Sequence, residues 1–295
     1  MISCAMISWC EGQTIDLALK GITGLADEVI IADSGSFDGT QDIAREWIDK
    51  LNLSGEVIDV EGHSLGQIRI KSYEACSHPW ILLIDSNLVL SNAINARFKR
   101  LAESKPNAIG CVRSLNLMGD YEHYFRGLPI HAPHASLFRK NNEAIRFTDD
   151  RDRPTIRTRK GIVSIEPVAV NLSRVRPAWR CWYRGEPFDE EHYVHRDTAT
   201  KKKTGFATKT NRQNRWNMDR QHKSLVEYVE ETQGLSLENV KRIAPQWYLE
   251  QLNRYALPLT KEMRGGLPEA IKTEQRDPRY KLVHRNGIIG RLPEL

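Results

Sequence analysis

Apolar runs of strand length alternate with segments of helical period over the first part of the chain. The strand-like runs are Met1–Ser8, Glu28–Ala32, Glu56–Val60 and Trp80–Ile84. The segments of helical period are Ile15–Ile22, Thr40–Leu51 with Thr40 as the expected N-cap, and Leu65–Cys76. Strands that alternate with helices through short loops predict an α/β fold with a mostly parallel, doubly wound sheet.

Polar residues follow these strands at the points where the strands end. Ser8, Asp33 and Asp85 all fall at the carboxyl end of a predicted strand. Ligands of open parallel sheets bind at that edge of the sheet. The pattern alone therefore predicts a ligand site that contains these three side chains.

The periodicity weakens beyond Val112. Strands are predicted over Ala135–Arg139 and Gly161–Leu172, residues 173–210 show no clear period, and residues 214–257 are predicted to be helical. The Pro-, Gly- and Arg-rich residues that follow are expected to pack loosely. We therefore expect a core over residues 1–172, with its first half ending near 115, a basic and largely helical region over 173–262, and a tail over 263–295.

The composition is that of an ordinary globular protein, with 40% hydrophobic and 27% charged residues among 295. No segment approaches the roughly 18 apolar residues of a membrane helix, and the N-terminal run lacks a basic leader. Five cysteines without CxxC spacing are expected to be reduced core residues. The expected location is the cytoplasm.

The net charge of +5 hides a difference between the two parts of the chain. Through Val112 there are 9 Lys and Arg against 15 Asp and Glu, and beyond it 34 against 23. Basic residues interleaved with aromatic ones are Lys201, Lys202, Lys203, Phe206, Lys209, Arg212, Arg215, Trp216 and Arg220. This pattern suits nucleic acid, through phosphate contacts and base stacking, and equally an anionic glycan or a solvated surface.

The segment EVIIADSGSFDGTQDIA, residues 28–44, resembles the second-strand signature of family 2 GT-A glycosyltransferases. Met6–Glu11 is similar to the first strand of that family. Leu65–Ser91 is similar to its next helix, its W-I-L strand and its D-x-D turn, and SLFRK at 136–140 is a weaker match. The resemblance implies a GT-A fold and an inverting glycosyltransferase with a nucleotide-sugar donor, for which UDP is the expected nucleotide.

The resemblance also implies roles for residues at the predicted strand ends. Asp33 is expected to accept a hydrogen bond from the N–H of the donor base. The other residues expected in the donor site are Ser8, Trp9, Glu11 and Arg69. Arg69 would reach a phosphate, and its alternative is a surface charge on an amphipathic helix. Gly35, Asp38 and Gly39 are expected to form the turn rather than to contact the ligand.

Asp85 is the pivotal residue of the predicted site. In the family, the D-x-D turn holds the ribose and a divalent cation, Mn²⁺ or Mg²⁺, because negative charge develops on the leaving diphosphate. Here the turn reads Asp85-Ser86-Asn87, and an amide oxygen carries no charge, so a cation is expected to bind more weakly. The resemblance adds a late histidine as a metal ligand, for which His195 and His192 are the candidates.

Transfer with inversion needs a general base for the acceptor hydroxyl. The family places a carboxylate after the strand equivalent to SLFRK, which indicates Asp149, Asp150 or Asp152. Arg151 and Arg153 stand among them, so a salt-bridged turn is the alternative.

The acceptor is expected to be either a modified base in DNA or a saccharide of the lipopolysaccharide type. A nucleotidyltransferase is disfavoured, because the first loop reads Trp9-Cys10-Glu11-Gly12 and has no Gly-rich phosphate loop with Lys. The remaining alternative is an inactive or cation-independent GT-A protein that binds nucleotide-sugar or nucleic acid.

Overall fold

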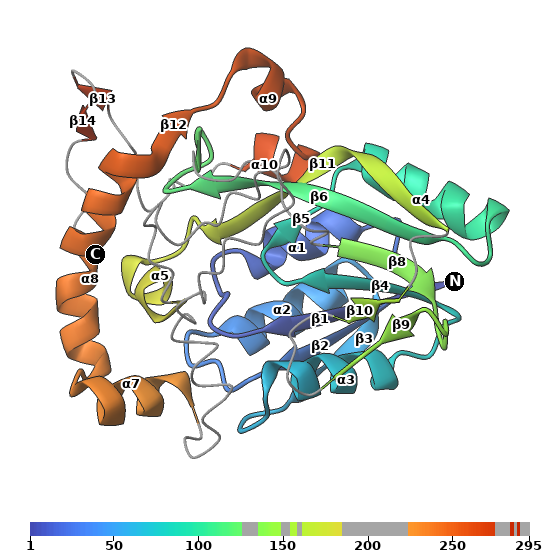
Figure 1. Cartoon of the computed structure of the whole chain (residues 1–295), viewed down its shortest axis with the longest axis horizontal. Coiled ribbons are helices and arrows are strands. Elements are labelled where there is room, and N and C mark those ends of the chain that lie inside the picture. Colours follow the sequence, from blue (N-terminus) through green and yellow to red (C-terminus); the bar gives the residue numbers. More distant parts are fainter. Residues whose placement is uncertain are drawn as a thin grey trace, which may run out of the picture.

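The computed structural model describes residues 1–125, 135–148, 154–157, 161–184 and 224–274, and the backbone of 284–285 and 288–289. One mixed sheet lies at the centre of this part of the chain (Figure 1). Its strands are β1 (Ile2–Ser8), β2 (Glu28–Asp33), β3 (Ser54–Asp59), β4 (Trp80–Asp85), β5 (Leu88–Val89), β6 (Ile109–Met118), β7 (His123–Phe125), β8 (Ala135–Arg139), β11 (Ile162–Arg174) and β12 (Ala256–Pro258). Two further strand pairs are β9 (Ile145–Arg146) with β10 (Thr155–Ile156), and β13 (His284–Arg285) with β14 (Ile288–Ile289).

The parallel part of the sheet has the order β3-β2-β1-β4, and β8 then runs antiparallel between β4 and β6. The register pairs Ser8 with Asp33, and Ile7 with Asp85. The predicted doubly wound α/β sheet is therefore confirmed in its first half. Ser8, Asp33 and Asp85 share one edge of that sheet, as their positions at strand ends predicted.

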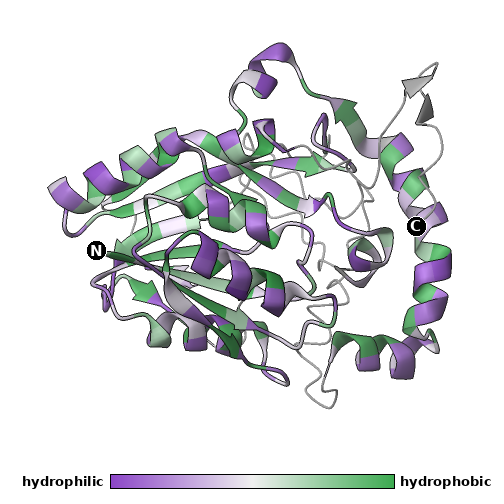
Figure 2. Ribbon diagram, turned by 180° about the vertical axis from the view of Figure 1, so that it is seen from behind, coloured by the Kyte–Doolittle hydropathy of each residue, from purple (hydrophilic) through white to green (hydrophobic). Residues whose placement is uncertain are grey.

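Helices cover both faces of the parallel strands. The side chains of Cys4 and Met6 belong to the core beneath α1 (Ile15–Ile22), α2 (Thr40–Lys50) and α4 (Asn92–Ser104). Ala5, which alternates with them, belongs to the core of the opposite face, where α3 (Leu65–Ala75) packs. Figure 2 shows the hydrophilic sides of the flanking helices turned away from the sheet.

Helix α2 begins one residue earlier than expected. Gly39, with φ 84°, is its N-cap, and Thr40 is the first helical residue. The Thr40 hydroxyl is committed elsewhere, because it donates to Asp38 and accepts from the backbone N–H of Glu11. Asp38 accepts a hydrogen bond from the Thr40 N–H at 3.2 Å, which is the turn-forming role predicted for it.

The residues after the parallel strands contain elements that the periodicity did not predict. Helix α4 and strand β6 both lie in the stretch for which no element was expected. Strand β6 buries Ser114 and Asn116 together with its apolar residues, so it lacks a clear apolar–polar alternation. Strand β11 confirms the strand expected near Gly161–Leu172 and extends it to Arg174.

The C-terminal part adds the helices α5 (Ala178–Arg184), α7 (Leu225–Gln233), α8 (Leu237–Tyr255), α9 (Lys261–Gly265) and α10 (Glu269–Lys272). In Figure 1, α8 runs along the side of the molecule beyond α5. One hydrophobic cluster joins Trp9 and Cys10 to residues of α5, α7 and α8. The expected boundary at residue 172 falls within β11, and the cluster connects the chain on either side of it.

The segment that was expected to pack loosely is partly ordered against the core. Strand β12 pairs with β7, and Leu267 and Ile271 are buried beside Leu17 and Val89. Leu259 is buried in the same cluster and Met263 and Ala270 pack against it, so apolar contacts hold this stretch despite its composition.

All five cysteines are free and buried, as predicted. Burial raises the pKa of the Cys10 and Cys76 thiols to about 12. In the described part of the chain, no helix has the length and apolar character needed to span a membrane.

Candidate functional site

A cleft opens at the carboxyl edge of the parallel strands. Residues predicted for the site that line it are Ser8, Trp9, Glu11, Arg69, Asp85 and Asn87. The lining also includes Ile7, Ser34, Leu65, Ile68, Ser86, Arg176 and Arg180. The structure therefore brings together most of the predicted donor site, from β1, α3 and β4.

The D-S-G-S-F-D-G-T motif builds one wall of the cleft by holding the loop after β1. Side chains of the motif accept hydrogen bonds from three successive backbone N–H groups of that loop. Cys10 donates to the Ser36 Oγ at 2.6 Å, Glu11 to the Thr40 Oγ1 at 2.7 Å, and Gly12 to the Asp38 Oδ2 at 3.0 Å. The motif thereby fixes the backbone that presents Trp9 and Glu11 to the cleft.

Asp33 lies behind this wall and is fully buried. Its carboxylate accepts hydrogen bonds from the Ser8 hydroxyl at 2.6 Å, from the N–H and hydroxyl of Ser36 at 2.8 and 2.6 Å, and from the Gln41 amide at 3.0 Å. Asp33 is not among the residues that line the cleft. The role of Asp33 as an acceptor for the donor base stays a prediction, and a base N–H would have to replace one of these donors, such as Gln41.

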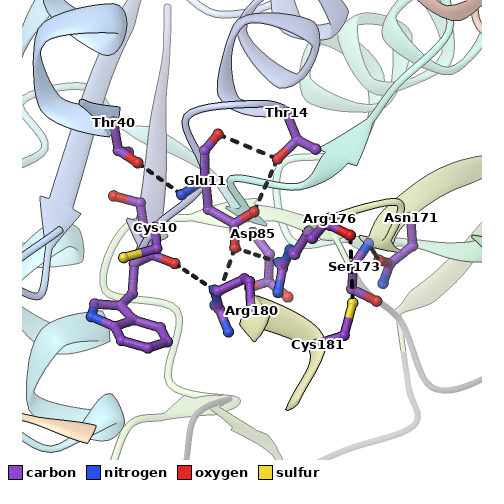
Figure 3. Close-up of polar contacts among 12 residues, drawn as sticks. Cys10, Glu11, Thr14, Thr40, Asp85, Asn171, Ser173, Arg176, Arg180 and Cys181 are labelled. Carbon is purple, nitrogen blue, oxygen red and sulfur yellow. Dashed lines mark hydrogen bonds and ion pairs between the residues drawn. The ribbon is translucent and has the colours of Figure 1, made fainter. Parts of the chain in front are cut away.

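Glu11 is buried between two arginines. Its carboxylate forms ion pairs with Arg176 and, at 3.3 Å, with Arg180, and the Thr14 hydroxyl donates to it at 2.9 Å (Figure 3). The Arg180 Nε also donates to the Trp9 carbonyl at 3.0 Å, and its guanidinium lies 4.4 Å from the centre of the Trp9 ring. Arginines stacked on aromatic rings and paired with carboxylates are well suited to buried sites.

Arg69 pairs with Asp85 at the end of β4. The Arg69 guanidinium donates to the Asp85 carboxylate and, at 3.1 Å, to the Ile84 carbonyl. The Arg69 side chain is 3% exposed, against 22% for that of Asp85. The alternative of a surface charge for Arg69 is therefore wrong. The reason is that its side of α3 packs onto the strand ends instead of facing solvent.

Asn87 presents a buried polar atom to the same region. Its Oδ1 has no hydrogen-bond partner within the described residues, while its backbone carbonyl accepts from the Leu172 N–H at 2.8 Å. Oxygen atoms of a carboxylate and an amide are suitable ligands for Mg²⁺ or Mn²⁺. No group of three His, Cys, Asp or Glu that could hold a metal occurs in the residues that the structure covers. Asp85 and Asn87 therefore fit a cation that brings phosphate oxygens with it, and not one held by protein alone.

Several predicted residues lie outside the described part of the chain. They are Asp149, Asp150 and Asp152 as candidate bases, His192 and His195 as candidate metal ligands, and the basic stretch 201–220. Their roles stay predictions.

Two cleft residues, Arg176 and Arg180, were not predicted. They belong to residues 173–210, where no period was recognisable, and only the positive charge beyond Val112 pointed to that part of the chain. The strand predicted over Gly161–Leu172 ends shortly before Arg176, and this signal would have placed Arg176 near a strand end.

A cleft of this kind at the carboxyl edge of the parallel strands, behind a D-S-G-S-F-D-G-T turn, defines an α/β protein of the GT-A class. The profile of glycosyl transferase family 2 matches residues 5–153, about half of the chain. The chain belongs to this family.

The solved structures that match the chain do so at low identity. S. aureus TarS, residues 1–349, is 12% identical over 85% of each chain, with a TM-score of 0.44. The glucosyl-3-phosphoglycerate synthase of Mycobacterium tuberculosis, in complex with Mn²⁺, UDP-glucose and phosphoglyceric acid, is 16% identical over 59% of this chain and 72% of that one, with a TM-score of 0.41. In complex with Mg²⁺ and UDP, the same synthase matches at 21% identity, over 39% of this chain and 43% of that one, with a TM-score of 0.31. No curated protein matches the chain.

Proposed function

We propose that the chain is an inverting glycosyltransferase that moves a sugar from a UDP-linked donor to an acceptor hydroxyl. The observation that carries this proposal is the cleft at the strand ends, in which Ser8, Trp9, Glu11, Arg69 and Asp85 meet within a family 2 chain. The UDP and UDP-glucose bound by the mycobacterial synthase agree with this choice of donor.

In the proposed reaction, the acceptor hydroxyl attacks the anomeric carbon, its proton passes to a carboxylate, and the nucleoside diphosphate leaves with the bonding electrons. We assign the proton acceptor to Asp149, Asp150 or Asp152. Arg69 acts on Asp85, because its guanidinium holds the carboxylate in one orientation at the cleft. Asp85 in that orientation is suited to accept from the ribose hydroxyls.

A divalent cation would be held by Asp85 and Asn87, with His195 as a further candidate ligand, and would neutralise charge on the diphosphate. The unpartnered Asn87 Oδ1 is the observation that favours this position. The pairing of Asp85 with Arg69 lowers the negative charge available to a cation.

For the acceptor, the charge beyond Val112 supports an anionic molecule, either DNA that carries a modified base or a lipopolysaccharide-type glycan. In this scheme, residues 1–172 form the donor-binding core, 173–262 the acceptor side and 263–295 a tail. DNA binding that falls steeply with salt would select the first acceptor. Salt-insensitive or absent DNA binding would select the glycan.

The activity is tested by measuring nucleotide release from a panel of UDP-, GDP- and TDP-sugars, with Mn²⁺ and with EDTA. We expect release from a UDP-sugar by the wild type and its loss in Asp85→Asn. Absence of release from the whole panel, together with no thermal stabilisation by any nucleoside diphosphate, would refute the proposal and leave an inactive binding module.

A further inference from the structure

Arg176 and Arg180 reach the cleft from a part of the chain outside the family match. That match ends at residue 153, and both arginines follow it. Strand β11 runs beside β6 and β5, and its Leu172 N–H donates to the carbonyl of Asn87 at 2.8 Å. This pairing places the end of β11 next to the Asp85-Ser86-Asn87 turn. The chain that leaves β11 therefore enters the cleft at the side where the phosphates of a donor would lie.

Aromatic packing holds α5, and with it Arg180, in place. The Trp179 ring stacks on Phe37 at 5.5 Å between centroids, and Tyr183 meets Trp9 edge to face at 5.9 Å. These contacts join α5 to the D-S-G-S-F-D-G-T turn and to the loop after β1. The two guanidinium groups are thus positioned by a packed layer, and their side chains are only 3% and 4% exposed.

Guanidinium groups outnumber carboxylates in the described lining of the cleft. This lining contains Glu11 and Asp85 together with Arg69, Arg176 and Arg180. Arg69 pairs with Asp85, while Arg176 and Arg180 both pair with Glu11. Buried guanidinium groups that border a cleft favour an anionic ligand in it.

Arg180 also retains a free donor. Its Nε bonds the Trp9 carbonyl and its Nη2 faces Glu11, but its buried Nη1 has no hydrogen-bond partner among the described residues. Guanidinium groups bind phosphate oxygens through charge-assisted, often paired, hydrogen bonds. A phosphate in the cleft would satisfy this donor.

We propose that Arg176 and Arg180 form a diphosphate-binding site that functions without a divalent cation. This inference rests on the proposed function insofar as the diphosphate belongs to the donor. The arginines supply positive charge to the diphosphate independently of a cation at the Asp85-Ser86-Asn87 turn, where an amide in place of a second carboxylate weakens cation binding. Glu11 orients both guanidinium groups, and Arg180 Nη1 contacts the phosphate oxygens.

The test is calorimetric titration of the full chain with inorganic pyrophosphate in EDTA. We expect the wild type to bind, and Arg180→Met to raise Kd on the order of tenfold, because one charge-assisted contact is lost. Arg176→Met should also raise Kd. The matched control is Arg113→Met, because Arg113 is half exposed and, among the interactions described, pairs only with the exposed Glu166. The Kd of this variant for pyrophosphate should equal that of the wild type.

Folding of each variant is checked by thermal unfolding. Where a Met variant does not fold, Arg180→Lys and Arg176→Lys replace it, because lysine keeps the charge beside Glu11 but not the forked donors; these should weaken binding several-fold. Equal Kd values for folded variants and wild type, or binding of pyrophosphate only with Mn²⁺ present, would overturn the inference.

The two proposals fail differently. Pyrophosphate binding that depends on the arginines, without nucleotide release from any sugar donor, would reject the transferase and retain the site. Nucleotide release that Arg176→Met and Arg180→Met leave unchanged would retain the transferase and reject the site.

Discussion

Replacing Glu11 by Gln tests whether this carboxylate neutralises the two arginines of the cleft. The change keeps the shape of the side chain and an oxygen for the Thr14 hydroxyl, but leaves Arg176 and Arg180 without their shared carboxylate. Breaking a buried ion pair in this way costs about 3 kcal/mol, at the lower end of the usual range because the group borders an open cleft. In a chain of this size that corresponds to a fall in Tm of roughly 6–12 °C.

The assay is urea and thermal unfolding followed by tryptophan fluorescence, to which Trp9 contributes from beside the altered charge. The matched control is Glu122→Gln, whose carboxylate is 55% exposed and pairs with Arg264 at 2.8 Å. That surface pair contributes about 0–1 kcal/mol, so the control should unfold almost as the wild type does. Pyrophosphate should restore more stability to Glu11→Gln than to the wild type. Equal stability of Glu11→Gln and Glu122→Gln would refute the assigned role of Glu11.

Three further predictions follow from the described contacts. Asp85→Asn should lower kcat/KM roughly a hundredfold, and wild-type turnover would contradict the role of Asp85 in the reaction. The same change should cost about 1–3 kcal/mol of stability, because Arg69 loses its carboxylate partner. Burial raises the pKa of Cys10 to about 12, so Ellman's reagent at pH about 8 should label it only after unfolding, and rapid labelling of the native protein would disprove the burial. Burial alone would raise the pKa of Glu28, but hydrogen bonds from two serine residues outweigh it and lower that pKa. Glu28 therefore stabilises the fold at pH values above its pKa in the unfolded state. This stabilisation is lost as the pH falls through its pKa in the folded state. The stability difference between wild type and Glu28→Gln should be largest at neutral pH and shrink in acid, and a pH-independent difference would exclude this linkage.

The parallel half of the sheet was predictable because its signals are local. Each strand is a short apolar run, and each polar residue that follows it lies at the strand end whatever the rest of the fold does. The positions of Ser8, Asp33 and Asp85 along one edge required only that the strands be parallel and in register. The donor side of the cleft follows from these positions.

The details of the turn were less predictable, because they depend on contacts between segments distant in the sequence. The sequence places Asp33 at a strand end but does not show that partners from β1, from the turn and from α2 donate to both of its oxygens. The family resemblance placed Arg69 in the donor site, but its pairing with Asp85 follows only from the packing of α3 on the strand ends. Sequence spacing does not reveal how many donors surround a carboxylate.

Arg176 and Arg180 were out of reach for a different reason. The predicted strand before Arg176 marks a strand end, but where that end lies depends on the pairing of β11 with β6 and on the aromatic packing of α5. Strand β8 inserts antiparallel between β4 and β6, so the order of the strands in the sheet differs from their order in the chain. Such long-range pairing is set by the whole fold and not by a pattern of residues.

Their location changes how the charge of the second part of the chain should be interpreted. By itself, the excess of Lys and Arg beyond Val112 favours an anionic acceptor. Arg176 and Arg180 belong to that excess, yet both face Glu11 in the cleft where the donor is expected. Part of the positive charge therefore balances the donor side, and total charge is a weak guide to the acceptor. The acceptor question depends instead on Lys201–Lys203 and the basic residues after them, whose substitution should change acceptor binding without changing the affinity for pyrophosphate.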